Sequence, residues 1–277
     1  MKGLIASDID GTLTDGIHEI SPHVVQYFEW LHKQGWMILF VTGRTFQFGY
    51  SILHRFTFPY YFAVQNGAML IKMPEKKMVH KQNLSQDILT SLDNTVKKYK
   101  IDYAIYTGFE NQDIVYFRPK NYTEPQLNYL KERAIAFKEN WQPIESYHSL
   151  KLLDFPSIKF IGEKPTIEQV AEDVQKNLSI YIPVIKDPFS PLKFVAQGTN
   201  PKANKGDIVQ YVHDKHLKSL PIIVAGDDYN DEPMFNVATT KVVMATAPEN
   251  LKKNADIIAP SAKDNGIIEG LNQAIRR

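Results

Sequence analysis

Apolar runs that end in polar loops alternate with amphipathic segments at the start of the chain. The run Gly3 to Ser7 leads into Asp8-Ile9-Asp10-Gly11-Thr12, which predicts a buried strand followed by a polar loop. A helix is predicted from Pro22 to about Lys33, and a strand over 37–41 then ends at Thr42-Gly43-Arg44. Strand, helix and strand in this order favour a βαβ unit, and therefore a parallel sheet.

The same alternation continues and then returns at the far end of the chain. A helix over 46–55 precedes an apolar stretch over 61–64, which ends at Gln65-Asn66-Gly67-Ala68. Near the C-terminus, the run 221–226 leads into Asp227-Asp228-Tyr229-Asn230-Asp231. Further elements are predicted there, namely a helix from about Pro233 and strands over 241–244 and 255–258. Both ends of the chain therefore predict one α/β sheet.

The middle of the chain has a different pattern, with helices and strands that do not alternate regularly. Predicted helices cover 85–99, 124–138 and 166–177, and predicted strands cover 114–117 and 157–161. This pattern is typical of a separate α+β unit. We therefore expect an α/β fold with a Rossmann-like parallel-sheet core, formed by residues 1–82 and 198–277, and an inserted α+β cap domain formed by residues 83–197.

Composition restricts the classes of function. The 277 residues are 43% hydrophobic and 23% charged, as in ordinary globular proteins, and they include no cysteine. The formal net charge of +1 provides no bulk attraction to nucleic acid or anionic lipid. The longest apolar run, Trp36 to Val41, is far shorter than the ~20 residues of a membrane helix. We expect a cytoplasmic protein that binds neither nucleic acid nor membranes, and its oligomeric state stays open.

Two acidic clusters follow predicted strands and carry the candidate chemistry. Asp8 and Asp10 are two residues apart, and two close carboxylates are tolerated when a cation lies between them or one is protonated. Oxygen ligands of this kind favour Mg²⁺. Backbone N–H groups at Gly11 can face an anion. The alternative interpretation is an Asp-rich turn that only ends a strand. The second cluster, 226–231, could also be a helix N-cap or a calcium loop, but it lacks the ligand series of an EF-hand.

Two further positions offer groups that suit phosphate oxygens. Thr42 and Gly43 provide a hydroxyl and an N–H after a predicted strand, although such a pair is more often only a turn. Lys205 opens a predicted helix through His213, which places an ammonium group beside a helix N-terminus. Lys202 is a competing candidate.

The order of these groups resembles the haloacid dehalogenase (HAD) superfamily. Its four motifs correspond to Asp8-Ile9-Asp10-Gly11-Thr12, to Thr42, to Lys205, and to Gly226-Asp227-Asp228 with Asn230-Asp231. The long insertion, Asn66-Gly67-Ala68 and the closing Asp264-Asn265-Gly266-Ile267 resemble the Cof-type phosphatase branch, which has a large α/β cap. Tyr229 is a departure, because relatives often carry a smaller residue there.

The resemblance implies a function and a role for each matching residue. It implies a Mg²⁺-dependent phosphatase that hydrolyses small phosphorylated metabolites, with Asp8 as the nucleophile that becomes an aspartyl phosphate and Asp10 as the general acid and base. Other roles implied are Mg²⁺ binding by Asp8, Asp10, Asp227 and Asp231, phosphate binding by Gly11, Thr42, Gly43, Lys205 and Asn230, and substrate contact by Arg44, Asn66 and Gly67.

Two other functions share much of this pattern. A phosphomannomutase has the same first motif and a similar cap placement, and a phosphoacceptor switch also uses an acidic pocket, a Thr and a Lys.

In the cap, we expect four aromatic residues to form the core, namely Tyr103, Tyr106, Phe109 and Tyr116. Three lysines are candidates to bind a second anion, namely Lys151, Lys159 and Lys193, although exposed lysines are the commoner case.

Overall fold

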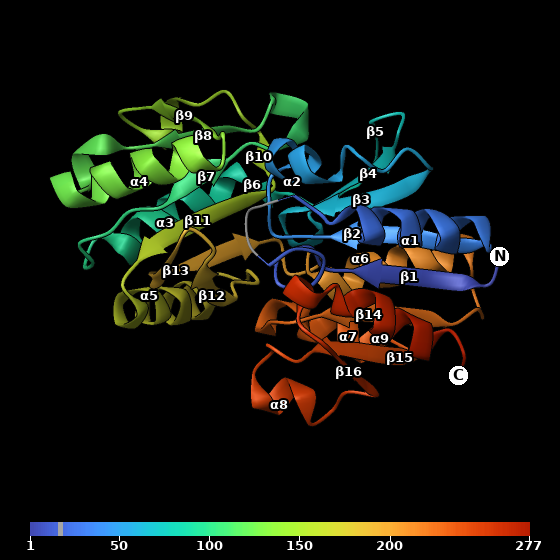
Figure 1. Cartoon of the computed structure of the whole chain (residues 1–277). Helices are drawn as coiled ribbons and strands as arrows, with labels where there is room; N and C mark the ends of the chain where they lie inside the picture. The colour runs from blue at the N-terminus through green and yellow to red at the C-terminus, as the bar shows by residue number, and fades with distance from the viewer. Residues whose placement is uncertain (16–18) are drawn as a thin grey trace.

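The computed structural model describes residues 1–15 and 19–277, which form two adjoining units (Figure 1). The core unit contains an eight-stranded sheet in the order β16-β15-β14-β1-β2-β3-β4-β5. Its strands are β1 (Gly3–Ser7), β2 (Trp36–Val41), β3 (Tyr60–Val64), β4 (Met69–Met73), β5 (Lys77–Lys81), β14 (Ile222–Gly226), β15 (Thr240–Met244) and β16 (Ile257–Ala259). The strands from β16 to β3 are parallel, and β4 and β5 extend the sheet in antiparallel fashion. The predicted parallel-sheet core is confirmed.

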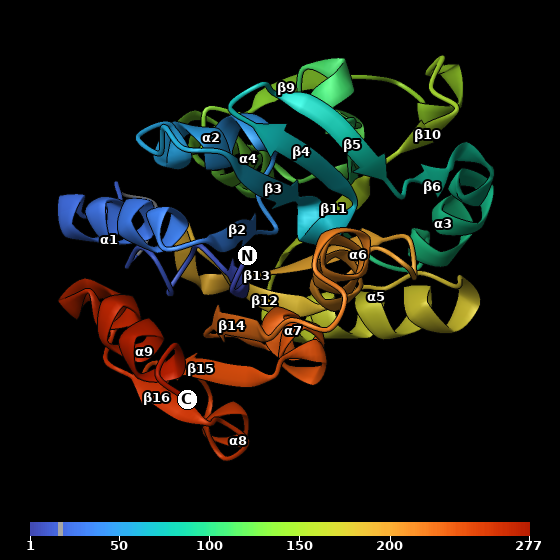
Figure 2. The same ribbon diagram turned by 90° about the vertical axis from the view of Figure 1, so that its right-hand side faces the viewer.

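Helices cover both faces of the core sheet (Figures 1 and 2). Buried side chains of α1 (Pro22–Lys33), α2 (Phe46–Leu53) and α9 (Gly266–Ala274) pack on one face. Those of α6 (Lys205–His216), α7 (Glu232–Val237) and α8 (Glu249–Lys252) pack on the other. Successive residues of β1 point to opposite faces of the sheet, because Ile5 belongs to the first apolar cluster and Leu4 to the second. Both faces of the sheet are therefore buried, as the continuous apolar runs of its parallel strands predict.

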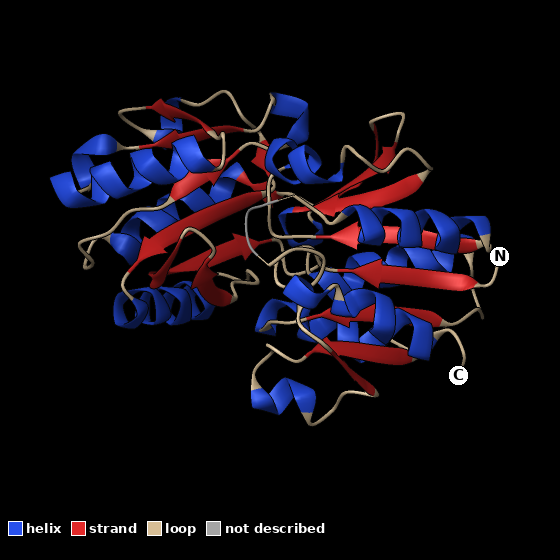
Figure 3. Cartoon of the chain, viewed as in Figure 1, coloured by secondary structure: helices blue, strands red, loops and turns tan. Residues whose placement is uncertain are grey.

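The inserted cap contains a second sheet, and Figure 3 shows how strands and helices divide between the two units. The order of its six strands is β12-β13-β11-β7-β8-β9. These strands are β7 (Ala104–Tyr106), β8 (Ile114–Phe117), β9 (Asn140–Pro143), β11 (Ser157–Gly162), β12 (Val184–Asp187) and β13 (Ser190–Thr199). Helices α3 (Leu89–Val96) and α5 (Lys164–Asn177) pack on one face, and α4 (Glu124–Ala136) contacts the other through Leu130.

Some elements differ from the sequence-based expectation for reasons of tertiary pairing. The helix expected over 85–99 is shorter, because Leu84 and Ser85 form strand β6 (Leu84–Ser85), which pairs with β10 (Asp154–Phe155). Strand β13 runs through residue 197 to Thr199, since its pairing with β11 continues to Ser157. Phe109 is not simply part of the cap interior: its ring lies 4.5 Å from that of Phe46 in the core. Tyr103 and Tyr106 are fully buried in the cap, as expected.

The two connections between core and cap lie side by side. Asn200, after β13, donates a 2.9 Å hydrogen bond from its side chain to the carbonyl of Asn83, which follows the last strand before the cap. The Gln82 side chain also reaches Asn200, at 3.5 Å. Both chain termini lie in the core, away from the cap (Figure 1). Among the described residues, no helix is long and apolar enough to cross a membrane.

Candidate active site

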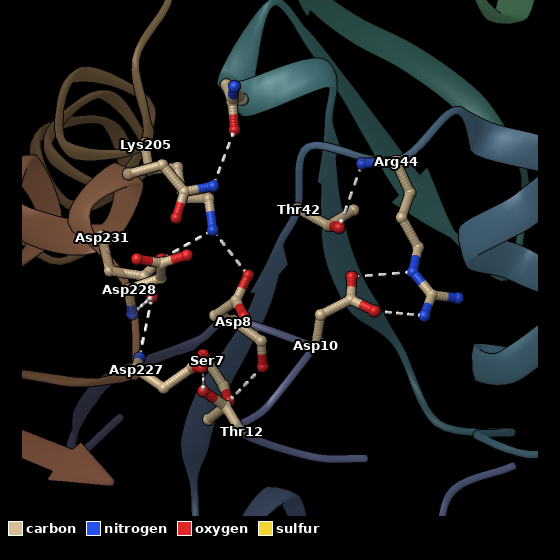
Figure 4. Close-up of polar contacts among 12 residues, drawn as sticks. Ser7, Asp8, Asp10, Thr12, Thr42, Arg44, Lys205, Asp227, Asp228 and Asp231 are labelled. Atoms are coloured by element: carbon tan, nitrogen blue, oxygen red, sulfur yellow. Dashed lines mark hydrogen bonds and ion pairs between the residues drawn. The ribbon is translucent and has the colours of Figure 1, made fainter. Parts of the chain in front are cut away.

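The predicted motif residues meet at one edge of the core sheet, facing the cap. Asp8 follows β1, Thr42 follows β2, Asp227 follows β14, and Lys205 is the first residue of α6. The carboxyl ends of adjacent parallel strands share one edge, so residues far apart in the sequence meet there (Figure 4). A cavity of about 340 Å³ lies at this edge and is lined by both core and cap residues.

Lys205 connects the first and last acidic clusters through buried ion pairs. Its Nζ donates to Asp8 Oδ1 at 2.5 Å and to Asp231 Oδ1 at 2.6 Å, and all three side chains are buried (Figure 4). Burial lowers the pKa of Lys205, but the carboxylates of Asp231 and Asp8 more than offset this and hold the pKa above its ordinary value. Lys205 is therefore a fixed positive charge beside Asp8. The competing candidate, Lys202, is exposed.

Asp231 organises the loop after β14 as well as its partner lysine. Its Oδ2 accepts hydrogen bonds from the backbone N–H groups of Asp227 at 2.8 Å and Asp228 at 3.1 Å. The start of α6 is tightly packed nearby, because a Cβ on Gly206 would lie 2.2 Å from the carbonyl oxygen of Pro233. Both the acidic loop and the helix that carries Lys205 are thus fixed by short contacts between elements.

Three carboxylates form a candidate metal centre. One oxygen from each of Asp8, Asp227 and Asp231 lies within 4.8 Å of the others. Burial, opposed by Lys205 and reinforced by Asp231 and Asp10, raises the pKa of Asp8 from its ordinary 3.8 to about 8. Burial and the charge of Asp8 also raise the pKa of Asp227 well above its ordinary value. A buried group of carboxylates whose charged forms are disfavoured suits a hard divalent cation with oxygen ligands.

The Asp10 side chain lies apart from this carboxylate cluster. Arg44 binds both of its oxygens, with Nε 2.8 Å from Oδ2 and Nη2 hydrogen-bonded to Oδ1. The Arg44 guanidinium also lies 3.8 Å above the ring of Phe48, whose ring stacks at 4.4 Å on Phe137 of the cap. Arg44, expected as a substrate contact, lines the cavity and forms a salt bridge with Asp10 there. A core–cap aromatic pair fixes the guanidinium that orients Asp10.

Some of the expected phosphate-binding residues line the cavity, and others are buried behind its wall. Gly11, Gly43 and Asn230 line the cavity, whereas Thr42 is fully buried and its Oγ1 accepts the backbone N–H of Arg44 at 3.1 Å. Lys205 is also buried behind the cavity wall, against Asp8.

Asn66 and Gly67, expected as substrate contacts, are not among the described residues that line this cavity. The Asn66 side chain accepts a 3.4 Å hydrogen bond from Asn230, which does line it. Gly67 has a φ of 94°, and a Cβ there would lie 2.7 Å from the carbonyl oxygen of Asn204, the N-cap of α6. Both residues therefore support the site from behind it.

The cap contributes charged and polar side chains that sequence reasoning mostly missed. Arg133, Glu139 and Gln197 line the cavity together with Lys159. Of these four residues, only Lys159 was a candidate from the sequence. Its burial distinguishes it from an ordinary surface lysine, because it is 6% exposed and lies on a central strand of the cap sheet. Lys193 instead pairs with Glu163. An isolated lysine within the apolar run of β11 was the available signal.

Tyr229 lies outside the cavity wall. Its side chain is 46% exposed, and its hydroxyl donates a 3.2 Å hydrogen bond to Asn250, which lies in α8. It therefore does not narrow the site in this structure, since the neighbouring Asp228 and Asn230 line the cavity and Tyr229 does not.

Comparisons with known proteins agree with this arrangement. Residues 5–271 match the haloacid dehalogenase-like hydrolases. The chain is 25% identical to the phosphatase YwpJ of Bacillus subtilis, over 95% of this chain and 96% of that protein. It is 21% identical to a phosphoglycolate phosphatase of Methanobrevibacter smithii, over 98% and 97% of the two chains. The fold is similar to that of a sugar phosphatase of HAD subclass IIB, with a TM-score of 0.75, 18% identity, and coverage of 99% of this chain and 100% of that one.

Proposed function

This chain belongs to the haloacid dehalogenase-like hydrolase family, and from that premise we propose that it is a Mg²⁺-dependent phosphatase of small phosphomonoesters that works through an aspartyl phosphate. The observation that carries the proposal is the buried ion-pair group in which Lys205 contacts both Asp8 and Asp231 at the edge of a cavity shared with the cap. Relatives named phosphatases along most of the chain support the same reaction class.

Asp8 is the proposed nucleophile. Its Oδ1 is held by Lys205, which leaves Oδ2 to attack phosphorus while the bond between phosphorus and the ester oxygen breaks. Bound Mg²⁺ would be held by the side chains of Asp8 and Asp227, supported by Asp231, and by the carbonyl of Asp10, and it would supply positive charge that offsets repulsion between the carboxylate and the phosphate. Lys205 provides a second positive charge, fixed before substrate binds.

Asp10 is the proposed general acid and base. Its carboxyl would give a proton to the leaving oxygen and then take one from the water that attacks phosphorus, which breaks the bond to Asp8 and releases phosphate. Arg44 donates one hydrogen bond to each oxygen of Asp10, and each oxygen keeps a second lone pair that can carry the proton. The N–H groups of Gly11 and Gly43, the Thr42 hydroxyl and the Asn230 amide are proposed to bind phosphoryl oxygens.

Phosphate release from a panel of small phosphomonoesters, with and without Mg²⁺, tests this function. We expect release that stops in excess chelator, returns when Mg²⁺ is added, and is lost in Asp8→Asn. Retention of a tenth of the wild-type activity in Asp8→Asn would refute the nucleophile assignment. A phosphomannomutase would instead show little net release without a bisphosphate activator, and a phosphoacceptor switch would accumulate a long-lived aspartyl phosphate.

A further inference from the structure

Two buried hydrogen-bond donors of the cap face the cavity beside each other. Lys159 is 6% exposed and Gln197 is 3% exposed, and both line the cavity that contains Asp8. They are direct partners in the antiparallel pair of β11 and β13. Side chains at paired positions point to the same face of a sheet, with Cβ atoms roughly 4.5–5.5 Å apart. The register of these two strands thus places an ammonium and an amide together above the catalytic edge of the core.

Neither donor has the partners that its burial requires. Lys159 Nζ, which can donate three hydrogen bonds, donates to the Gly43 carbonyl at 3.3 Å and otherwise lies 4.4 Å above the Tyr106 ring. Gln197 Nε2 is buried and has no acceptor among residues 1–15 and 19–277. Within the same part of the chain, no carboxylate forms an ion pair with Lys159. Buried donors without acceptors are costly, so such a pair is typical of a site that a ligand completes.

The nearby acidic side chains hydrogen-bond to groups other than Lys159, and Asp113 among them accepts the backbone N–H of Gln47 at 2.7 Å. Arg133 pairs at 3.0 Å with Glu139 and at 3.0 Å with Asp187. Glu139 also accepts the Trp141 indole N–H at 2.8 Å. Asp10, on the core side, is held by Arg44 as described above. Among the described residues, Lys159 therefore has no direct ion-pair partner, although Glu139 and Asp187 share the one guanidinium of Arg133 and leave negative charge nearby. Burial lowers the pKa of Lys159 to about 8.

Starting from the proposed phosphatase function, we propose that Lys159 and Gln197 form a subsite for a carboxylate on the leaving group, so that the preferred substrates are phosphorylated hydroxy acids. One unpaired ammonium matches the single negative charge of a carboxylate, and the amide N–H₂ can donate to its second oxygen. The cavity joins these donors to Asp8 and Asp10, so that one small molecule can reach both sets of residues. A neutral leaving group would leave the ammonium unpaired and is disfavoured.

The test compares phosphorylated hydroxy acids with their primary amides, which have the same shape without the charge. The acids carry one to three carbons between the ester oxygen and the carboxyl group, beginning with 2-phosphoglycolate. We expect wild-type kcat/KM to favour the best acid over its amide by roughly 30-fold to 100-fold, as for a hydrogen bond to a charged group. Lys159→Met should reduce this preference to about threefold while it retains hydrolysis of the amide, and Gln197→Leu should reduce it partially.

Controls separate recognition from stability and from the proposed chemistry. Lys193→Met removes a cap lysine that pairs with Glu163, and it should leave the preference unchanged. Lys159→Met should unfold at the same temperature as wild type or higher, because it removes a buried charge that has no ion-pair partner among the described residues. Lys159→Gln is the second variant if Lys159→Met does not fold. Wild type that hydrolyses acid and amide equally well would overturn the subsite while leaving the phosphatase intact.

A binding experiment decides the subsite even without turnover. Calorimetry would compare phosphonoacetate with phosphonoacetamide on wild type and Lys159→Met, in the presence of Mg²⁺. Tighter binding of the acid to wild type, with the difference lost in Lys159→Met, supports the subsite, and equal affinities overturn it. Absence of phosphate release from every substrate would overturn the proposed function instead.

Discussion

Replacing Asp8 by Asn should make the metal-free protein more stable at neutral pH, although the proposed mechanism requires that the same change abolish catalysis. Burial raises the pKa of Asp8 from 3.8 to about 8, so its carboxyl is protonated in the folded state at a pH where it is ionised in the unfolded chain. The stability that this group contributes is complete below pH 3.8 and is lost as the pH rises to about 8. The neutral amide of Asn has no such dependence.

The magnitude follows from the two pKa values. One pKa unit corresponds to about 1.4 kcal/mol, so Asp8 removes about 4 kcal/mol from the free energy of unfolding between pH 5 and pH 8. We expect Asp8→Asn to lack this loss, and its advantage over wild type to grow by about the same amount across that range.

Urea unfolding in excess chelator at pH 5, 6, 7 and 8 measures this difference. Asp214→Asn is the matched control, since its side chain is 64% exposed on α6, and its free energy of unfolding should follow that of wild type. Curves for wild type and Asp8→Asn that run parallel from pH 5 to pH 8 would show that Asp8 is ionised at little cost in the folded protein, and the reasoning above would be wrong.

Two further substitutions test the parts of the core that hold the site. Lys205→Met should lower kcat/KM by roughly 100-fold to 1000-fold, because it removes a fixed charge that stabilises the proposed transition state. Lys202→Met, at an exposed lysine, should change kcat/KM by less than about twofold. Similar losses in both variants would exclude the specific role of Lys205. Gly206→Ala should lower the free energy of unfolding by about 2 kcal/mol, because a Cβ would lie 2.2 Å from the Pro233 carbonyl oxygen. An unchanged urea midpoint for Gly206→Ala would mean that α6 can shift without cost.

Local patterns predicted which core residues lie together, because most of these residues follow strand ends. Asp8, Thr42 and Asp227 each come directly after an apolar run, and parallel strands bring such positions to one edge. Lys205 was identified by its place in the order of motifs, and the structure puts it against Asp8. The positions of these residues relative to the predicted strands were therefore enough to predict that their side chains lie near one another.

The cap could not be predicted in the same detail, because its contribution depends on strand register. Lys159 lies opposite Gln197 because β11 and β13 pair in one particular register. A shift of one strand by one residue would move its side chain to the opposite face of the sheet. Arg133 and Glu139 are six residues apart, on opposite sides of the end of α4, and meet through an ion pair that no periodicity indicates. Both contacts depend on tertiary structure, namely the strand register of the cap sheet and its packing against α4.

The paired connections between core and cap make the cap an exchangeable part. Asn200 touches both Gln82 and Asn83, so the chain leaves the core and re-enters it at nearly one point. A short turn could join the two ends without disturbing the order of the core strands, since the core sheet is built entirely from residues before and after the insertion. A different cap grafted at this junction would change the leaving-group preference of the proposed phosphatase, provided that it supplies a ring in place of Phe137, which stacks on Phe48 beside Arg44.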